Sequence, residues 1–441
     1  KRGGLIFEIG QQNGLRYTLY LDDIIIYEVD DSYFNKYNLN DVEGEPIITN
    51  VPTIYVNTIN NQQVPYDKNI YVDGTFNLVD GENPFLNIND LSLRIRARGN
   101  SSLWMPKRSY RIKFNKAVDL YGMNKNKDWV LLANHADKSL IRNYLAFELG
   151  SKLSNLEYTP QCMFVNFYFN NNYEGLYLLA TQIETGTNRV NIEYDYTNDD
   201  IDIPFLIEWD NRLTNPNENN GAIEGIDYFV VDWIPFGLKY PDSFNEMTYN
   251  QKRYIYNYMN NVHTSILNRK NYDSFIDVDS FIDYFIVQEL FKNVDMGFAS
   301  VFMYKEKGGK LKFGPLWDFD LSIGNADYID YSPYNWFSQD NSGNPWFNSL
   351  MKHPTFKKQF TKRFNEVKNT IIQDLIDSVD IIGRDLYEHA SNNFERWKTL
   401  GKYDWPNPPK VVAASTYDEQ IYYVKNYLIE RVKWMDYVLN E

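Results

Sequence analysis

The chain has 441 residues, of which 43% are hydrophobic and 17% aromatic, and its 44 basic and 59 acidic side chains give a net charge of −15 at pH 7. This composition excludes an intrinsically disordered chain, because the apolar residues suffice for a large core. The negative charge disfavours nucleic acid as a partner, since the chain would repel a phosphate backbone.

The sequence offers little support for a membrane or disulfide-bonded protein. No apolar run approaches the roughly 20 residues of a membrane-spanning helix, so we expect no membrane span. The first residues lead directly into a strand-like run, Leu5–Ile9, and we expect no signal peptide in the chain as given. Cys162 is the single cysteine and cannot form an internal disulfide.

Up to about residue 115 the chain predicts β-strands. Short β-branched or aromatic runs alternate with clusters of Asn, Asp, Gly and Pro, which is typical of strands and turns. The predicted strands cover 47–59, 70–79, 91–98 and 109–114.

A basic stripe runs through the last two of these strands. Arg94, Arg96 and Arg98 alternate with apolar residues, so one face of the strand is cationic. Further basic residues follow a short turn: Lys107, Arg108, Arg111 and Lys113. Backbone amides of the small residues in that turn, 99–102, can approach a phosphate. The stripe is therefore a candidate anion site, and the alternative is a solvated strand face with salt bridges.

The periodicity becomes helical from about residue 137, where Asp137 or Ser139 can cap a helix that runs to Leu153. Strands return at 163–169, 176–180, 205–209 and 228–231. The last half predicts helices at 248–267, 279–292, 355–369, 371–396 and 416–438, the last with a capping box at Thr416 and Glu419. This order of elements predicts the α+β class, with a β-rich N-terminal part and a largely helical C-terminal part.

One non-helical segment, 293–325, interrupts the helical half. Two strand-like runs flank Gly308-Gly309 and predict a hairpin, which would bring Asp295 close to Asp318. If the backbone stays extended, Asp318 and Asp320 also point to one side. Three carboxylates without His or Cys favour Mg²⁺, Ca²⁺ or Mn²⁺ over Zn²⁺. The alternative is that these residues form turns and helix caps.

These segments resemble the CotH kinase family, the atypical protein kinases of the bacterial spore-coat protein H type. The motifs that carry the resemblance occur in family order over about 90–325: Arg98-Gly99-Asn100-Ser101-Ser102, Lys107–Phe114, Trp129–Leu132, Asp137, Arg142-Asn143, Gly175-Leu176-Tyr177, Asn188-Arg189-Val190, Asn293-Val294-Asp295 and Trp317-Asp318-Phe319-Asp320. The resemblance implies a spore-coat or extracellular enzyme with an atypical protein-kinase-like fold. It would use ATP and Mg²⁺ or Mn²⁺ to phosphorylate Ser residues of coat-type or secreted proteins.

The resemblance also divides the chain and gives its residues roles. A β-rich region, 1–90, precedes a kinase-like domain, 91–441, whose helical lobe begins at about 241. Asp295 takes the family's catalytic position, and the metal position falls on Asp318. Asp320 is a second metal candidate because of its position two residues beyond Asp318. Four basic residues are cofactor-binding candidates: Lys107, Arg111, Lys113 and Arg98. Trp104 and Tyr110 are pocket candidates.

Two positions depart from the family pattern. Thr181 stands where family members carry a Glu, with Glu184 as a nearby substitute, and Ser300 stands where an Asn is usual. These departures motivate a second hypothesis, a catalytically weak nucleotide-binding scaffold in a spore coat or extracellular assembly. A carbohydrate-active protein is a third hypothesis, and it is disfavoured because the aromatic residues are spread along the whole chain.

Overall fold

The computed structural model describes residues 37–196, 200–337 and 344–441. The chain divides into two compact units, Lys1–Tyr37 and Asn38–Glu441, and the second unit contains every element described below. The strand predicted at Leu5–Ile9 lies outside the described residues.

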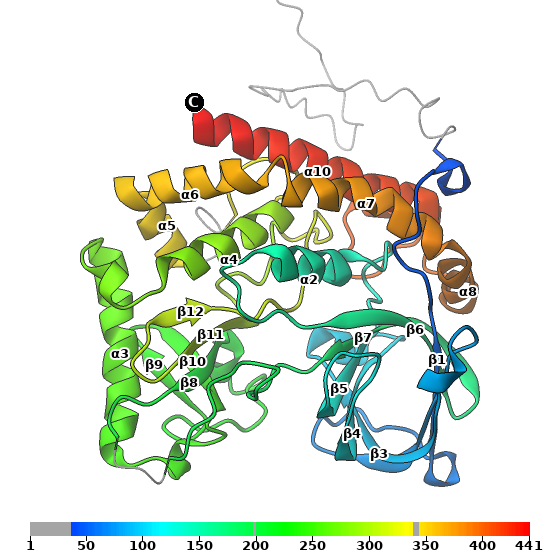
Figure 1. Ribbon diagram of the computed structural model, residues 1–441, viewed down its shortest axis with the longest axis horizontal. Helices are drawn as coiled ribbons and strands as arrows, with labels where there is room; N and C mark the ends of the chain where they lie inside the picture. The colour runs from blue at the N-terminus through cyan, green and yellow to red at the C-terminus, as the bar shows by residue number, and fades with distance from the viewer. Residues whose placement is uncertain (1–36, 197–199, 338–343) are drawn as a thin grey trace, which may run out of the picture. The chain divides into compact units, whose positions relative to one another are not determined.

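Seven strands of the second unit form a closed barrel in the order β1-β2-β3-β4-β5-β7-β6 (Figure 1). Neighbouring strands are antiparallel except β1 and β6, which close the barrel in parallel. The strands are β1 (Thr53–Thr58), β2 (Val72–Val79), β3 (Ile88–Arg98), β4 (Ser109–Val118), β5 (Asn126–Leu132), β6 (Cys162–Phe169) and β7 (Asn172–Thr181). The sequence did not predict β5, because its last five residues are all buried and show no period of two.

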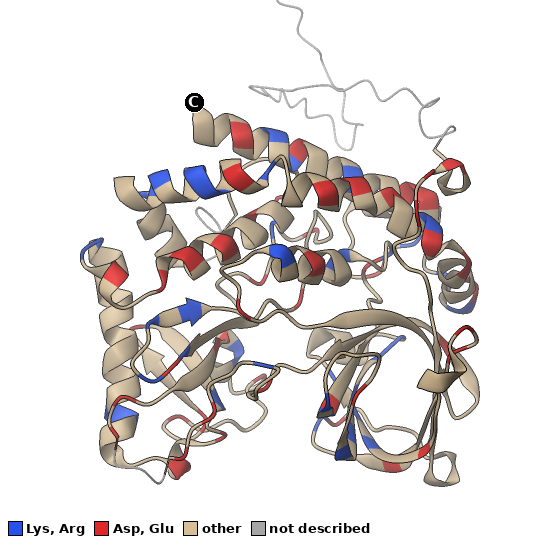
Figure 2. Cartoon of the chain, in the orientation of Figure 1, with Lys and Arg blue, Asp and Glu red and all other residues tan. Residues whose placement is uncertain are grey.

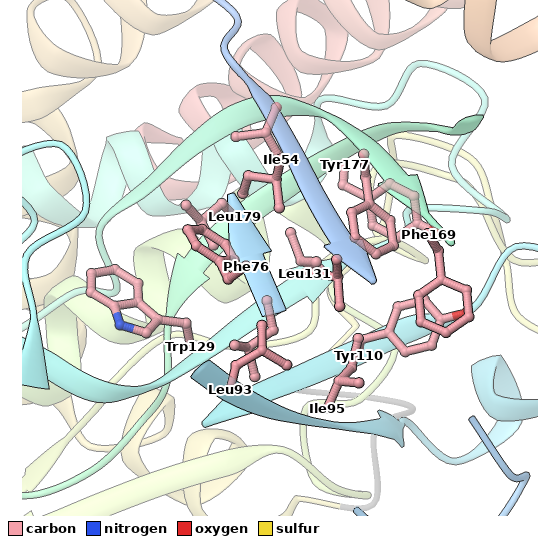
Figure 3. Packing of buried hydrophobic residues seen from close by; sticks show 14 of the residues in the cluster. Ile54, Phe76, Leu93, Ile95, Tyr110, Trp129, Leu131, Phe169, Tyr177 and Leu179 are labelled. Atoms are coloured by element: carbon pink, nitrogen blue, oxygen red, sulfur yellow. The ribbon is translucent and has the colours of Figure 1, made fainter. Parts of the chain in front are cut away.

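Apolar side chains from all seven strands fill the barrel (Figure 3). On β3, Ile95 and Ala97 are completely buried, so the intervening arginines lie on the outer face. The register places basic residues of two strands opposite each other: Arg94 opposite Lys113 and Arg96 opposite Arg111. The predicted cationic strand face is confirmed.

Strand β3 passes through residues 90 and 91, where the sequence places a domain boundary. Strands from both sides of that point belong to the one barrel. The segment before residue 91 therefore contributes two walls of the barrel, β1 and β2.

A second sheet has the order β12-β11-β8-β10-β9. Its strands are β8 (Phe205–Trp209), β9 (Tyr228–Val231), β10 (Ile234–Tyr240), β11 (Val301–Lys305) and β12 (Leu311–Phe313). The predicted hairpin around Gly308-Gly309 is confirmed as β11 and β12. Strand β10 was missed, because Pro235 and Gly237 interrupt its apolar pattern.

The C-terminal half is helical, and the predicted α+β class is confirmed. The helices are α2 (Arg142–Lys152), α3 (Tyr249–Asn268), α4 (Val278–Phe291), α5 (Pro345–Met351), α6 (Pro354–Val367), α7 (Ile371–Asp385), α8 (Tyr387–Trp397), α9 (Pro409–Ala413) and α10 (Tyr417–Asn440). The single helix predicted over 371–396 is wrong, since α7 ends and α8 begins at Leu386. The capping box at Thr416 is confirmed.

The helices pack in a layer in which α10 contacts α4, α6 and α7, and α2 contacts α4 and α7 (Figure 1). Helix α8 covers β7 of the barrel, and α4 packs against β12 of the second sheet. Among the described residues, no helix is both long enough and apolar enough to cross a membrane.

A buried ion pair joins the C-terminal helix α10 to α4. The Arg431 guanidinium donates to the Glu289 carboxylate at 2.6 Å, and both side chains are completely buried. Arg431 also donates to the Glu289 carbonyl at 2.8 Å and to the Asn335 carbonyl at 2.7 Å. This one side chain therefore ties α10 to α4 and to the segment that follows the second sheet.

We expect Arg431→Met to lower the free energy of unfolding by about 3–5 kcal/mol, because it removes the cation that faces a buried carboxylate. Lys433→Met is the matched control, since Lys433 lies on the same helix in an exposed pair with Glu430, and its effect should stay within about 0.5 kcal/mol. Urea denaturation measures both. Similar effects for the two variants would contradict the role given to Arg431.

Candidate active site

The loop that carries Asp295 lies between α4 and β11. Asn293 accepts the Asp295 backbone N–H at 3.3 Å, and the Asp295 carbonyl accepts the Phe298 N–H at 2.9 Å. Asn211, directly after β8, donates its backbone N–H to the Phe298 carbonyl at 2.7 Å and its side-chain amide to the Gly297 carbonyl at 3.2 Å. The end of β8 therefore fixes the loop from the neighbouring strand.

The hairpin places Asp318 beside the loop that carries Asp295, since Ser300 of that loop donates its hydroxyl to Asp318 at 3.2 Å. Burial raises the pKa of Asp295 well above its ordinary value, and the nearby charge of Asp318 is the next cause. Burial, followed by the charges of Asp318 and Asp137, raises the pKa of Asp320 to about 8. Like charges in a desolvated site disfavour ionisation. The basic side chains near these carboxyl groups therefore do not supply enough positive charge to keep them ionised.

The backbone around Asp318 turns rather than staying extended. Asp318 has φ +66°, in the left-handed region, so the expectation that Asp318 and Asp320 share the face of an extended strand is wrong. Phe319 between them is completely buried and packs on Phe291. Its backbone N–H donates to Asn143 at 2.8 Å. A turn anchored by Phe319 thus brings the two carboxylates together.

A buried ion pair supports this turn from the segment between β5 and α2. Asp137 accepts the backbone N–H of Ser139 at 3.0 Å and that of Arg142 at 2.9 Å, and it also pairs with the Arg142 guanidinium. Arg142 in turn donates to the carbonyls of Ser322 at 2.9 Å and Ile323 at 3.3 Å. Helix α2 begins at Arg142 with Ile141 as its N-cap and without a side-chain cap bond, so the helix cap predicted at Asp137 or Ser139 is wrong. Asp137 instead holds the turn before α2 and orients the arginine that holds residues 318–323.

Arg98 lies beside Trp317, the residue that precedes Asp318. Its guanidinium lies 5.1 Å from the centre of the Trp317 ring. Burial lowers the pKa of Arg98 to about 10, and the charge of Asp318 partly offsets this effect. Within the described ranges Arg98 has no carboxylate at ion-pair distance. It is therefore a half-buried cation on the outer face of β3 that is available to an anionic ligand.

Arg111 and Lys113 are instead neutralised by the barrel itself. The Arg111 guanidinium pairs with Asp128 at 2.7 Å and with Glu184 at 2.8 Å. Lys113 lies 3.4 Å from the other oxygen of Asp128. Figure 2 shows such acidic positions among the Lys and Arg positions of the barrel strands. For these two residues the salt-bridged strand face, the alternative considered from the sequence, describes the observed contacts.

Lys107 lies elsewhere in the barrel wall. Its side chain is 1% exposed, its ammonium donates to the Leu176 carbonyl at 2.6 Å, and it lies 4.6 Å from the centre of the Tyr177 ring. Desolvation lowers the pKa of Lys107 to about 7. The structure does not bring this lysine to the three carboxylates.

The two pocket candidates also separate. Tyr110 is buried in the barrel and stacks on Phe169 (Figure 3), so it contributes to the core. Trp104 is 71% exposed and stacks on Tyr66. Only Trp104 is accessible to a ligand.

The two positions that depart from the family pattern have different surroundings. Thr181 is completely buried and its hydroxyl bonds to Tyr158 at 2.8 Å, while Glu184 takes the nearby basic partner, Arg111. Ser300 donates its hydroxyl to Asp318 at 3.2 Å. Ser300 therefore touches the carboxylate that the sequence assigns to the metal.

Sequence reasoning missed two residues near the cluster. Arg212 pairs with Asp210 at 2.8 Å, and its charge opposes the rise in the pKa of Asp295. Tyr328 is half-exposed, stacks on Trp405, and has its pKa raised by burial and then by Asp295 and the other carboxylates. The available signal for Arg212 was a polar Asp-Asn-Arg run immediately after a fully buried strand.

The residues present suit a divalent cation chemically, although they are not assembled around one. Among the described residues, no group of three or more His, Cys, Asp or Glu side chains is arranged to hold a metal ion. The donors at Asp318, Asp320 and Ser300 are all oxygens, the type that Mg²⁺ prefers. A cation would also relieve the repulsion that raises the pKa values of Asp295 and Asp320.

Comparison with known proteins covers most of the chain. A family model described as CotH kinase protein matches residues 95–435. The match includes Arg98 and the three carboxylates Asp295, Asp318 and Asp320. A search of curated proteins finds no match to the chain.

The buried lysine gives a pH-dependent prediction. The pKa of Lys107 is about 7 in the folded protein, whereas its ordinary value, which applies to the unfolded chain, is 10.5. Between these two pH values the unfolded chain therefore binds more protons than the folded protein. The stability of the wild type relative to Lys107→Met should therefore rise with pH in this window, by up to about 1.4 kcal/mol per unit. Urea unfolding at pH 7 to 10 measures the difference. The control Lys358→Met, at an exposed site on α6, should show none, and a flat difference for Lys107→Met would contradict the burial argument.

Proposed function

The chain belongs to the CotH kinase family, a kinase-like family of enzymes, and from this premise we propose that it transfers the γ-phosphoryl group of ATP to Ser residues of coat-type or secreted proteins. The observation that carries the proposal is the placement of Asp318 between the Asp295 loop, through Ser300, and the Arg98 guanidinium, which lies over the adjacent Trp317 ring and has no ion-pair partner among the described residues. We also propose a spore-coat or extracellular location, as the family resemblance implies.

Asp295 is proposed to orient the acceptor hydroxyl and to accept its proton. It lies in a loop fixed by Asn211, so its position is defined before the substrate binds. Burial and the charge of Asp318 raise the pKa of Asp295, and Arg212 opposes this rise. A bound metal would act in the same direction as Arg212 and favour the ionised carboxylate, which is the form that accepts a proton. Positioning of this kind is the main requirement of phosphoryl transfer.

Asp318 and Asp320 are proposed to hold the divalent metal, and Arg98 to bind phosphate oxygens. When bound, Mg²⁺ or Mn²⁺ and ATP supply the transferable phosphoryl group and neutralise its developing charge. The Asp137–Arg142 pair and Asn143 keep the Asp318 turn in place. The buried rings of Trp317 and Phe319 help to exclude water from the turn.

A catalytically weak scaffold is the second candidate function. The observation that favours it is the hydrogen bond from the Ser300 hydroxyl to Asp318. In the family, an Asn amide is usual at the position of Ser300. Thr181 does not favour it, since Glu184 already pairs with a basic residue of β4. Both candidate functions require nucleotide binding, and only the kinase requires efficient phosphoryl transfer.

Transfer of label from γ-labelled ATP, with Mg²⁺ or Mn²⁺, to a Ser-containing protein acceptor tests the proposal. We expect Asp295→Ala to reduce transfer by about 10²-fold or more, the contribution of a positioned general base, while nucleotide affinity is retained. Asp318→Ala should lose metal affinity and transfer together. Asp279→Ala, which removes an exposed carboxylate on α4, is the control for charge. Equal loss of binding and transfer in Asp295→Ala would refute the division of roles, and nucleotide binding without any transfer by the wild type would favour the scaffold.

Ser300→Asn tests whether this position limits the enzyme. Ser300 has φ +58°, a conformation that Asn adopts more readily than Ser, so the substitution should preserve the fold. We expect it to tighten metal binding and to increase phosphoryl transfer, because the amide oxygen is a better ligand for a hard cation. Calorimetric titration with Mn²⁺ compares it with the wild type and with Ser300→Ala. Unchanged Mn²⁺ affinity in both variants would place the metal away from Ser300.

A further inference from the structure

The loop between β1 and β2 brings a lysine to the basic face of β3. Lys68 in this loop donates its ammonium to the Asn100 side chain at 2.7 Å. The Arg96 guanidinium donates to the Lys68 carbonyl. Lys68 is therefore tied both to the outer face of β3 and to the turn between β3 and β4.

Aromatic stacking holds the same loop in place at a second point. The rings of Tyr66 and Trp104 are parallel to within 8°, with centroids 5.3 Å apart. Arg108 donates to the Val64 carbonyl at 3.0 Å and lies 4.4 Å from the centre of the Tyr66 ring. The loop is thus attached to the β3–β4 turn along its length, which defines the position of Lys68.

Lys68, Arg96 and Arg98 form what we call the cation cluster. In the part of the chain that the structure describes, none of the three has a carboxylate at ion-pair distance, whereas Arg111 and Lys113 on the adjacent strand share Asp128. Three neighbouring cations without counter-charges repel one another. The absence of an internal anion is notable in a chain with a net charge of −15.

The cation cluster borders the acidic cluster, because the Arg98 guanidinium lies 5.1 Å from the centre of the Trp317 ring, and Trp317 directly precedes Asp318. Burial lowers the pKa of Lys68, and the positive charges of Arg212, Arg96 and Arg98 lower it further. The charge of Asp210 partly opposes this effect. Arg212 is also the cation that opposes the rise in the pKa of Asp295, and Arg98 is influenced by Asp318. The same arginines thus link Lys68 to the carboxylates proposed for catalysis and metal binding.

We propose that Lys68 binds the polyphosphate of the nucleotide together with Arg96 and Arg98. This inference rests on the proposed function, and it extends the site to a residue that precedes the family match at 95–435. A metal-bound polyphosphate is the ligand that fits, because its oxygens neutralise the cations and its metal neutralises the carboxylates beside them. A simple anion would satisfy the first requirement and not the second.

Calorimetric titration of the full chain with inorganic tripolyphosphate and with ATP, both with Mg²⁺, tests the inference. Lys68→Ala should weaken both ligands by a similar factor, roughly five- to tenfold for one charge-assisted contact. Lys358→Ala makes the same change in charge on α6 and should leave both affinities unchanged. Lys68→Arg should restore most of the affinity, because it keeps the charge, and this variant distinguishes a lost contact from a disturbed loop.

Unchanged affinity in Lys68→Ala, or a loss that Lys68→Arg does not restore, would overturn the inference. Its failure is separable from that of the proposed function. Weaker tripolyphosphate binding in Lys68→Ala, without label transfer by the wild type, would support the phosphate site and contradict the kinase activity. Active wild type with unchanged affinity in Lys68→Ala would contradict only the role of Lys68.

Discussion

The buried ion pair between Asp137 and Arg142 connects the barrel to the turn that carries Asp318. Both side chains are completely buried, so each depends on the other for its solvation, and loss of either would leave an uncompensated charge in the core. Arg142 also donates hydrogen bonds to the carbonyls of Ser322 and Ile323. The left-handed turn at Asp318 is thereby fixed by residues about 180 positions earlier in the chain. The geometry of the candidate metal site is therefore a property of the tertiary structure and not of its local sequence.

The separation of charge around this turn explains how a strongly acidic chain can hold a small polyanion. On one side lie Asp295 and Asp320, whose pKa values are raised by burial and then by the charge of Asp318. On the other lies the cation cluster, which has no acidic partner among the described residues. Each group alone is unfavourable, and a ligand that carries both a metal and phosphates relieves both. The net charge disfavours polymeric phosphate as a partner, and it does not exclude a nucleotide.

Period-two alternation and hairpin signals allowed a good part of this arrangement to be predicted. The alternation on β3 correctly predicted its cationic face, and Gly308-Gly309 predicted the hairpin that brings Asp295 and Asp318 together. Local patterns could not show that Lys107 points into the barrel wall or that Arg111 is neutralised by Asp128, because both depend on which distant strands lie alongside. Lys68 and Arg212 were missed for the same reason, since each lies in a loop whose position is set by strand order.

The most direct test of this account is a crystal structure with Mn²⁺ and a non-hydrolysable ATP analogue, in which the anomalous signal locates the metal. The account predicts a manganese peak at the Asp318 and Asp320 carboxylates, with the phosphates of the analogue lying between that peak and Arg98. A manganese peak remote from Asp318, or phosphates bound away from Arg98, would contradict it.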